Sequence, residues 1–181
     1  TSANTAEIIN RMDSNVVLFG PDMNLAKYAE SHTDKKVIPI PPFGFCPVHK
    51  LFNREEILRL RRMHPDAEVI AHPECDPSVC KIADFVGSTS RMYREAIVSK
   101  AKKFIVATEI GFLHRLKKNR SDATFIPAYD EAICVNMKLH TLEKIYLSLK
   151  NERYKVVLPA RIREMAKKPV EFMLKTRETQ G

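Results

Sequence analysis

Short β-branched apolar runs alternate along the chain with polar loops and with amphipathic stretches of helical period. The clearest runs lie at 16–19, 69–71 and 104–107, and each precedes a polar loop and then a helical stretch. Shorter strands are expected at 37–40, 125–126 and 155–158. Buried runs that alternate with helices are typical of parallel strands linked by crossover helices. The pattern therefore predicts an α/β fold of repeated, Rossmann-like strand–loop–helix units with parallel sheets.

Capping residues and the apolar period predict where the helices begin. Asn53 precedes a stretch in which Ile57, Leu60 and Met63 share one face, and Pro65 follows its end. Further helices are expected to begin at Asp76-Pro77, at Ser88 or Thr89, at Thr141 and at Pro159. No linker rich in glycine or serine divides these elements, so any subdomains are expected to pack closely.

The loops after the strands are the expected place for chemistry. Ligands of parallel sheets collect at the carboxyl ends of the strands, close to helix N-termini. The loops concerned are 20–24, 41–50, 72–78, 87–90 and 108–112. We therefore expect the functional side chains to lie in these five segments.

The composition is that of an ordinary globular protein. The 181 residues are 44% hydrophobic and 29% charged. No apolar run has the length needed to span a bilayer, and no signal-peptide pattern opens the sequence. A cytoplasmic location without membrane contact is the resulting expectation.

A formal net charge of +8 would suit a polyanionic partner, such as nucleic acid or small phosphates and carboxylates. Charge runs on predicted helices usually face solvent, however. Here those runs are Arg59, Arg61 and Arg62, then Lys100, Lys102 and Lys103, then Lys117, Lys118 and Arg120. Because neither an aromatic RNA-binding signature nor a helix-turn-helix pattern accompanies them, nucleic acid is not an expected partner.

Two loops combine residue types that catalyse reactions or bind metals. Cys46 and His49 lie three positions apart in a loop rich in proline and glycine, where they could ligate a metal or form a nucleophile pair. His72, Glu74 and Cys75 follow a strand end, where the imidazole and the carboxylate could perform acid–base chemistry. Taken singly, each loop is more often structural than functional.

Anion binding is the chemistry expected at a predicted helix start. Ser88 and Thr89 offer hydroxyls and backbone N–H groups there, although an ordinary N-cap is an equal explanation. Ser2 lies in a similar turn. Cys134 precedes the helix at 141–149 and is unremarkable unless Cys46 is its neighbour in space.

The residues alone leave two alternatives open. One is a non-catalytic α/β module that binds an anion or RNA through its basic surface. The other is a mononuclear zinc enzyme with a site formed by Cys46, His49, His72 and Cys75. The four cysteines fit no zinc-finger spacing.

The ordered set of motifs resembles the quinolinate synthase family. The motifs are TSAN at 1–4, LFGPDMNL at 18–25, CPVH at 46–49, AHPEC at 71–75, AD at 83–84, GST at 87–89, TE at 108–109 with Gly111, and CVNMK at 134–138. The resemblance implies a transferase of NAD biosynthesis that condenses iminoaspartate with dihydroxyacetone phosphate and loses phosphate and water. L-aspartate oxidase or aspartate dehydrogenase would supply the iminoaspartate.

The resemblance also implies a 4Fe–4S cluster. Members hold it with three cysteines, one from each of three α/β domains in a pseudo-threefold arrangement, and the open iron acts as a Lewis acid. Cys46 and Cys134 match two of these ligands, whereas Cys75 and Cys80 are not ligand positions. The third ligand is expected upstream of this sequence.

Roles for the remaining site residues are carried over from the same family. His72 and Glu74 match residues that contact the reacting substrate, with Glu74 expected to transfer a proton. His49 is expected to line the same cavity and to take part in catalysis. Binding of substrate carboxylate or phosphate oxygens is the role expected of Ser2, Ser88 and Thr89.

The resemblance further predicts the domain limits. Residues 1–47 would complete a second α/β domain, and residues 48–134 would form a third. Residues 135–181 would be a helical segment that packs on a first domain, which this sequence lacks. We therefore expect an uncovered apolar face, and we expect the chain alone neither to keep a stable cluster nor to turn over.

Overall fold

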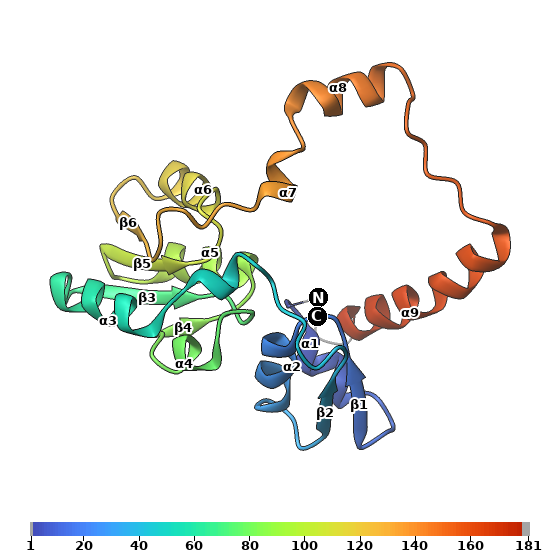
Figure 1. Cartoon of the computed structure of the whole chain (residues 1–181), viewed down its shortest axis with the longest axis horizontal. Helices are drawn as coiled ribbons and strands as arrows, with labels where there is room; N and C mark the ends of the chain where they lie inside the picture. The colour runs from blue at the N-terminus through green and yellow to red at the C-terminus, as the bar shows by residue number, and fades with distance from the viewer. Residues whose placement is uncertain (1, 179–181) are drawn as a thin grey trace. The chain divides into compact units, whose positions relative to one another are not determined.

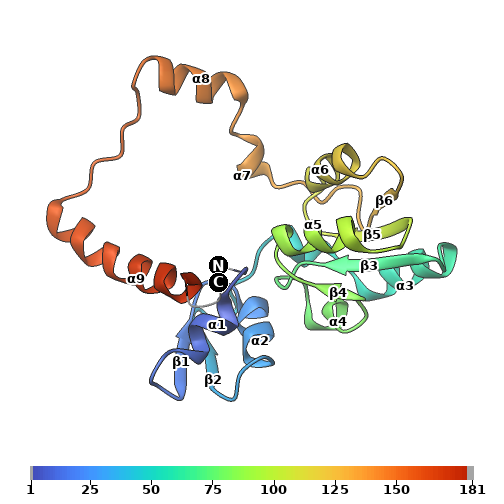
Figure 2. The ribbon, with the colours of Figure 1, turned by 180° about the vertical axis from the view of Figure 1, so that it is seen from behind.

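The computed structural model describes residues 2–178, with side chains through residue 174. The chain divides into two compact units, of which the first ends at Cys134 and the second begins at Val135. Figures 1 and 2 show the ribbon from two opposite sides. Each unit is described by itself.

A small parallel sheet opens the first unit. Strand β1 (Val16–Phe19) pairs with β2 (Lys36–Pro39), and Val17 lies opposite Val37. Helices α1 (Thr5–Asn10) and α2 (Met23–Glu30) complete this part. Its core consists of Ile9, Val17, Ala26, Ala29 and Val37. Burial of each of the three larger side chains, Ile9, Val17 and Val37, contributes about 1.5–3 kcal/mol relative to exposure.

The second sheet of the first unit has four parallel strands in the order β4-β3-β5-β6. The strands are β3 (Ala67–Ala71), β4 (Phe85–Val86), β5 (Lys103–Ala107) and β6 (Thr124–Pro127). Successive side chains of a strand point to opposite faces, and both faces are buried here. Parallel strands that alternate with helices confirm the predicted α/β fold.

Helices cover both faces of this sheet (Figure 1). On one face, α3 (Arg54–Met63) and α4 (Pro77–Cys80) contribute Ile57 and Val79 to a cluster that contains Val69 and Ile105. On the other, α5 (Thr89–Val98) and α6 (Phe112–Asn119) form a second cluster, which includes Met92, Leu116, Ile70 and Phe104. The adjacent residues Val69 and Ile70 of β3 therefore pack into the clusters on opposite faces of the sheet.

The predicted helix starts are confirmed. The side chain of Asn53 accepts hydrogen bonds from the backbone N–H groups of Glu55 and Glu56, and that of Asp76 accepts from Ser78. Ser88 is the N-cap of α5, and Thr141 is the N-cap of α8 (Leu142–Lys150). Helix α9 (Ala160–Glu178) begins directly after Pro159.

Three local expectations were wrong. The segment 155–158 is not a strand, because Val156 and Val157 are exposed and no described strand pairs with it. Met63 is 58% exposed rather than part of the inner face of α3. Arg120, expected in solvent, is buried: its guanidinium donates to the carbonyl oxygens of Ala96 and Ala101. The two-residue strand β4 was not predicted.

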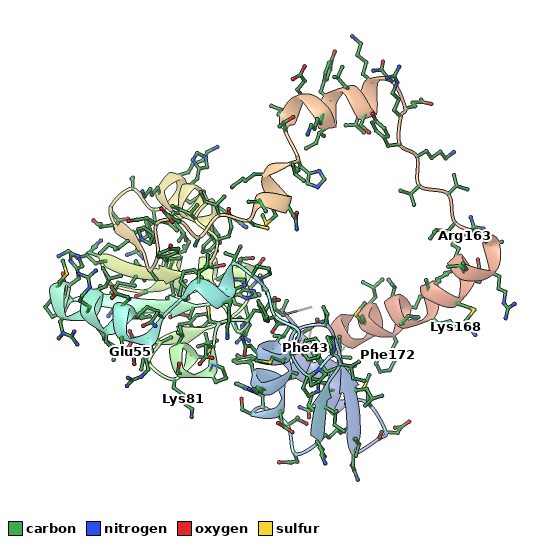
Figure 3. All side chains as sticks on the ribbon, viewed as in Figure 1. Phe43, Glu55, Lys81, Arg163, Lys168 and Phe172 are labelled. Atoms are coloured by element: carbon green, nitrogen blue, oxygen red, sulfur yellow. The ribbon has the colours of Figure 1, made fainter. Side chains whose placement is uncertain are left out.

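The second unit contains α7 (Val135–Lys138), α8 and α9. Helix α7 was not predicted. Large apolar side chains on α8 and α9 are exposed, among them Leu142, Ile145, Tyr146, Leu149, Ile162, Met165 and Phe172. Phe172 is labelled in Figure 3, which draws the side chains as sticks. The packing of this unit on a further domain, and the domain limits at 47 and 134, stay predictions. Among the described residues, no helix combines the length and apolarity that crossing a membrane requires.

Candidate active site

The four-stranded sheet reverses its strand order beside β3. The chain passes from β3 to β4 on one side and then to β5 on the other. The loops that leave β3 and β5 therefore diverge at their carboxyl ends, which is where parallel sheets bind ligands. His72 and Glu74 follow β3, and Thr108 follows β5, so the sheet brings these side chains to one place.

His49 connects the two loops. It lies in the short 3-10 helix His49–Leu51 and is buried. Its Nδ1 is 3.1 Å from Oε2 of Glu74, and its Nε2 is 3.1 Å from Oγ1 of Thr108. The imidazole ring of His72 stacks on that of His49, with 4.3 Å between the centroids and 12° between the planes. Three separate segments thus meet at a single imidazole.

Cys46 completes a compact group of possible metal ligands. One ligand atom each of Cys46, His49 and Glu74 lies within 4.8 Å of the others. The backbone N–H of Cys46 donates to Oδ2 of Asp22 at 2.7 Å, which fixes the loop that carries the thiol. The group offers sulfur, nitrogen and oxygen, a donor set that suits either a metal or a proton-transfer network.

Opposite charges stabilise each other within this group. Burial by itself would lower the pKa of His49, but its hydrogen bonds with Cys46 and Glu74 outweigh burial and raise that pKa to about 9. The hydrogen bond from His49 lowers the pKa of the Cys46 thiol and also the pKa of the Glu74 carboxyl. The imidazolium form of His49 therefore favours, and is favoured by, the negatively charged forms of Cys46 and Glu74.

The pKa of His72 is shifted in the opposite direction to that of His49. Burial, followed by the positive charge of His49, lowers the pKa of His72 to about 4. Its Nδ1 accepts a 3.3 Å hydrogen bond from the backbone N–H of Glu74, so the proton of the neutral ring resides on Nε2. His72 therefore presents a neutral N–H donor beside a charged imidazolium.

Supporting contacts in this region were not assigned by the sequence analysis. Thr108 was noticed within a motif, but its hydrogen bond to His49 depends on contacts distant in sequence. Asn24, which is 1% exposed, donates from Nδ2 to the carbonyl oxygen of Glu74 at 3.1 Å. The signal for these residues in the sequence was their place after a strand: Thr108 follows β5, and Asn24 follows β1.

The residues expected to bind anions lie outside the Cys46–His49–Glu74 group. Ser88 is buried, and its Oγ accepts a 3.4 Å hydrogen bond from the backbone N–H of Arg91, as an N-cap does. Thr89 is exposed at the first position of α5. Ser2 lines a small cavity of about 60 Å³ together with Tyr28 and Arg91. Arg91 was not singled out from the sequence, and it is a natural anion ligand.

The mononuclear zinc site of the alternative interpretation was wrongly composed. Of its four members, Cys46 and His49 belong to the observed group, while Glu74 takes the third place. Cys75 is 1% exposed and its thiol donates to the carbonyl oxygen of Ala107 at 3.5 Å, so it faces the core. Nδ1 of His72 is occupied by the N–H of Glu74.

Cys46 and Cys134 fit the iron–sulfur cluster that the family resemblance implies. Both side chains are half-buried and pack against the same hydrophobic cluster beside β3 and β5. Iron–sulfur clusters are held by thiolates, and partial burial shields them from solvent. These two residues provide two thiols, so a complete ligand set needs at least one more from outside this pair.

A larger cavity lies apart from this group. It encloses about 590 Å³ between α2 and the segment 73–86. Lys81, labelled in Figure 3, lines it, as do Tyr28 and Cys80. The lining of this cavity includes none of Cys46, His49, His72 or Glu74. The candidate active site is therefore located by the side-chain group and not by this cavity.

Known proteins similar to this chain share one name. The family model described as quinolinate synthetase A protein matches residues 1–175. The relative from Methanothermobacter thermautotrophicus, named quinolinate synthase, is 46% identical over 98% of this chain and 58% of its own length. Quinolinate synthases of Thermotoga maritima and Pyrococcus furiosus are 48% and 44% identical over 94% and 96% of this chain. The chain spans 56–58% of the length of these curated relatives. By this match and by the site just described, the chain belongs to the quinolinate synthetase A family.

Proposed function

We propose that this chain contributes the larger part of a quinolinate synthase active site, which condenses iminoaspartate with dihydroxyacetone phosphate and releases phosphate and water. The observation that carries the proposal is the group of Cys46, His49 and Glu74 at the point where the strand order reverses, with His72 stacked against it. Family membership supports the same reaction.

Proton transfer is assigned to Glu74. Condensation of an imine or enamine with a carbonyl compound requires a base that removes a proton and later returns it. Oε2 of Glu74 lies 3.1 Å from Nδ1 of His49, so the protonated imidazole donates to the carboxylate and holds it in place. The lowered pKa keeps Glu74 ionised and ready to accept.

His72 is assigned the role of a hydrogen-bond donor to a substrate oxygen. A neutral imidazole with its proton on Nε2 donates a hydrogen bond without bringing a full charge into the site. Such a donor stabilises negative charge that develops on a carbonyl or hydroxyl oxygen. Burial, followed by the charge of the stacked imidazolium of His49, keeps His72 neutral, so the two histidines divide the two roles.

Anion binding is assigned to the start of α5 and to Ser2. Ser88 and Thr89 lie at the N-terminus of this ten-residue helix, where the helix dipole favours carboxylate or phosphate. Ser2 and Arg91 line one cavity, which adds a hydroxyl and a guanidinium to the set. These groups orient dianionic substrates.

Cys46 and Cys134 would hold a 4Fe–4S cluster together with a third cysteine from outside this chain. When bound, the cluster supplies a Lewis acid that polarises a substrate oxygen and eases loss of water. Iminoaspartate would come from L-aspartate oxidase or aspartate dehydrogenase, and the product would enter NAD biosynthesis.

The test joins this chain to the part of the Methanothermobacter relative that it does not match and measures quinolinate formation under anaerobic conditions. Glu74→Gln should lower kcat by about 100-fold or more, as expected for loss of a general base. Glu68→Gln is the matched control: Glu68 lies on β3 as well, but its carboxylate accepts from Oγ of Ser99. It should change kcat by less than about three-fold. Equal activity of Glu74→Gln and the unmodified protein, at equal iron content, would refute the assignment.

The isolated chain provides a second test. We expect it neither to form quinolinate nor to retain iron after anaerobic reconstitution and desalting, because Cys46 and Cys134 are only two thiolate ligands. Robust turnover by the 181-residue chain alone would contradict this expectation.

A further inference from the structure

Two hydrogen bonds join the loop that carries Cys46 to the loop after β1 and clamp it there. The N–H of Cys46 donates to Oδ2 of Asp22 at 2.7 Å. Met23 follows Asp22, and its N–H donates to the carbonyl oxygen of Gly44 at 2.7 Å. Asp22 is buried, and its other oxygen accepts from the N–H of Leu25 at 2.8 Å. The carboxylate is therefore held at both oxygens.

The backbone of Cys134 is clamped in the same way by the loop after β5. Its N–H donates to Oε1 of Glu109 at 3.4 Å. Ile110 follows Glu109, and its N–H donates to the carbonyl oxygen of Ala132 at 2.9 Å. Oε2 of Glu109 accepts from the N–H of Gly111 at 2.7 Å. Again a carboxylate with both oxygens engaged fixes one cysteine.

The two clamps occupy equivalent places in two sheets. In each, the residue after the carboxylate binds the carbonyl oxygen two positions before the cysteine. Cys46 follows Pro39, the last residue of β2, by seven positions, and Cys134 follows Pro127, the last residue of β6, by seven positions. The clamping loops follow β1 and β5, which are the parallel neighbours of β2 and β6.

Steric contact makes the first clamp tight. A Cβ added to Gly44 would lie 1.9 Å from the carbonyl oxygen of Pro21, and one added to Gly20 would lie 2.7 Å from that of Ile40. The two loops therefore approach each other backbone to backbone, which only glycine permits at these positions. An ordinary N-cap of α2 would require neither this approach nor the bond to Cys46.

We propose that Asp22 and Glu109 are positioning residues that hold the backbones of Cys46 and Cys134 so that both thiolates serve one iron–sulfur cluster. The inference rests on the proposed function, because the cluster belongs to it. Neither carboxylate needs to contact substrate. Charge-assisted hydrogen bonds are about twice as strong as neutral ones, so a carboxylate suits this task better than an amide or hydroxyl. Each clamp acts on its own cysteine.

The first experiment needs no cluster. Amide hydrogen exchange is measured on the metal-free chain and on Asp22→Ala, Glu109→Ala and the control Asp84→Ala. Asp84 also accepts a backbone hydrogen bond, from Val69 at 2.8 Å, but away from both cysteines. Asp22→Ala should raise exchange about ten-fold in 42–47 and not in 130–135, and Glu109→Ala should do the reverse. Asp84→Ala should affect neither segment. Unchanged exchange at both cysteines would overturn the proposal.

The second experiment uses the joined protein with a reconstituted cluster. Asp22→Ala and Glu109→Ala should each lower bound iron at least about three-fold and alter the electron paramagnetic resonance signal of the reduced cluster, since backbone contacts near thiolates tune it. Asp22→Asn, which keeps one acceptor oxygen for the N–H of Cys46 or of Leu25, should restore part of the iron. Normal iron and an unaltered signal in both alanine variants would refute the role. If the unmodified joined protein never binds a cluster, the proposed function is refuted. Loss of local exchange protection in the variants would then show that the clamps only stabilise the local structure.

Discussion

His49 and His72 stack with 4.3 Å between their ring centroids, yet they favour opposite protonation states. Burial lowers the pKa of His49, but its hydrogen bonds to Cys46 and Glu74, together with the negative charges of these groups, raise it to about 9. The pKa of His72 is lowered to about 4 by burial and by the charge of His49. One carboxylate, that of Glu74, is near both rings but engages His49 more closely, at 3.1 Å against 4.0 Å. Burial of His72, together with the closer contacts of His49 with Cys46 and Glu74, thus separates the two titrations.

The depressed pKa of His72 predicts a pH dependence of stability in the metal-free chain. Between about pH 4 and the ordinary value of 6.5, the unfolded state binds a proton at His72 that the folded state does not. The free energy of unfolding should therefore fall as the pH is lowered through this window, by on the order of 3 kcal/mol from this residue. Urea unfolding at a series of pH values measures it.

The control for this prediction is a pair of variants. His72→Gln should flatten the dependence between pH 4 and 6.5, because the titrating ring is gone. His114→Gln should keep it, since His114 is exposed on α6. Identical pH curves for His72→Gln and the unmodified chain would show that His72 titrates normally.

Asn24 should matter for stability because it ties α2 to the loop of Glu74. Asn24→Ala leaves the carbonyl oxygen of Glu74 without this 3.1 Å bond and creates a cavity at a fully buried position. The cost should be about 1–3 kcal/mol in the free energy of unfolding. Asn119→Ala is the matched control, since its amide also donates to a backbone carbonyl, that of Arg115, but on the surface. It should change stability by less than about 0.5 kcal/mol. Similar costs for both variants would contradict the importance of burial here.

Local features of this fold were accessible from the sequence. Asn53 and Asp76 were identified as helix caps because the interaction lies within three residues of the cap. The placement of Glu74 and Thr108 at one edge was also foreseeable, since β3 and β5 are parallel neighbours and deliver their following loops to the same edge. Both inferences depend on short-range rules.

Features that depend on distant partners were not accessible. The segment 155–158 has strand-like side chains, but strand formation needs a neighbour, and Val156 is 83% exposed. The two-residue strand β4 has too short a pattern to recognise and exists because β3 pairs with it. The bond from Thr108 to His49 joins positions 59 residues apart. No periodicity within one segment encodes such a contact.

Cysteine reactivity should separate the buried thiols from the others. Cys75 is 1% exposed, and burial raises the pKa of its thiol well above the usual range. In the native, metal-free chain, iodoacetamide should modify Cys75 at least about 100-fold more slowly than Cys46, because it must wait for local opening. Peptide mapping by mass spectrometry after timed quenching measures both rates. In urea above the unfolding transition the two rates should converge. Rapid native modification of Cys75 would contradict its burial.

Arg120 should be sensitive to loss of its guanidinium, although it ends a run of basic residues that otherwise face solvent. Its three nitrogens donate to the carbonyl oxygens of Ala96 and Ala101 and to Asp122, which joins the end of α5, the segment before β5 and the turn after α6. Arg120→Lys keeps the charge but lacks the planar fork, so it should lower the free energy of unfolding by about 1–3 kcal/mol. Lys117→Ala, an exposed position of α6, should change it by less than about 0.5 kcal/mol. Urea denaturation of both variants measures the difference. If Arg120→Lys is as stable as the unmodified chain, charge alone suffices and the directed hydrogen bonds do not contribute.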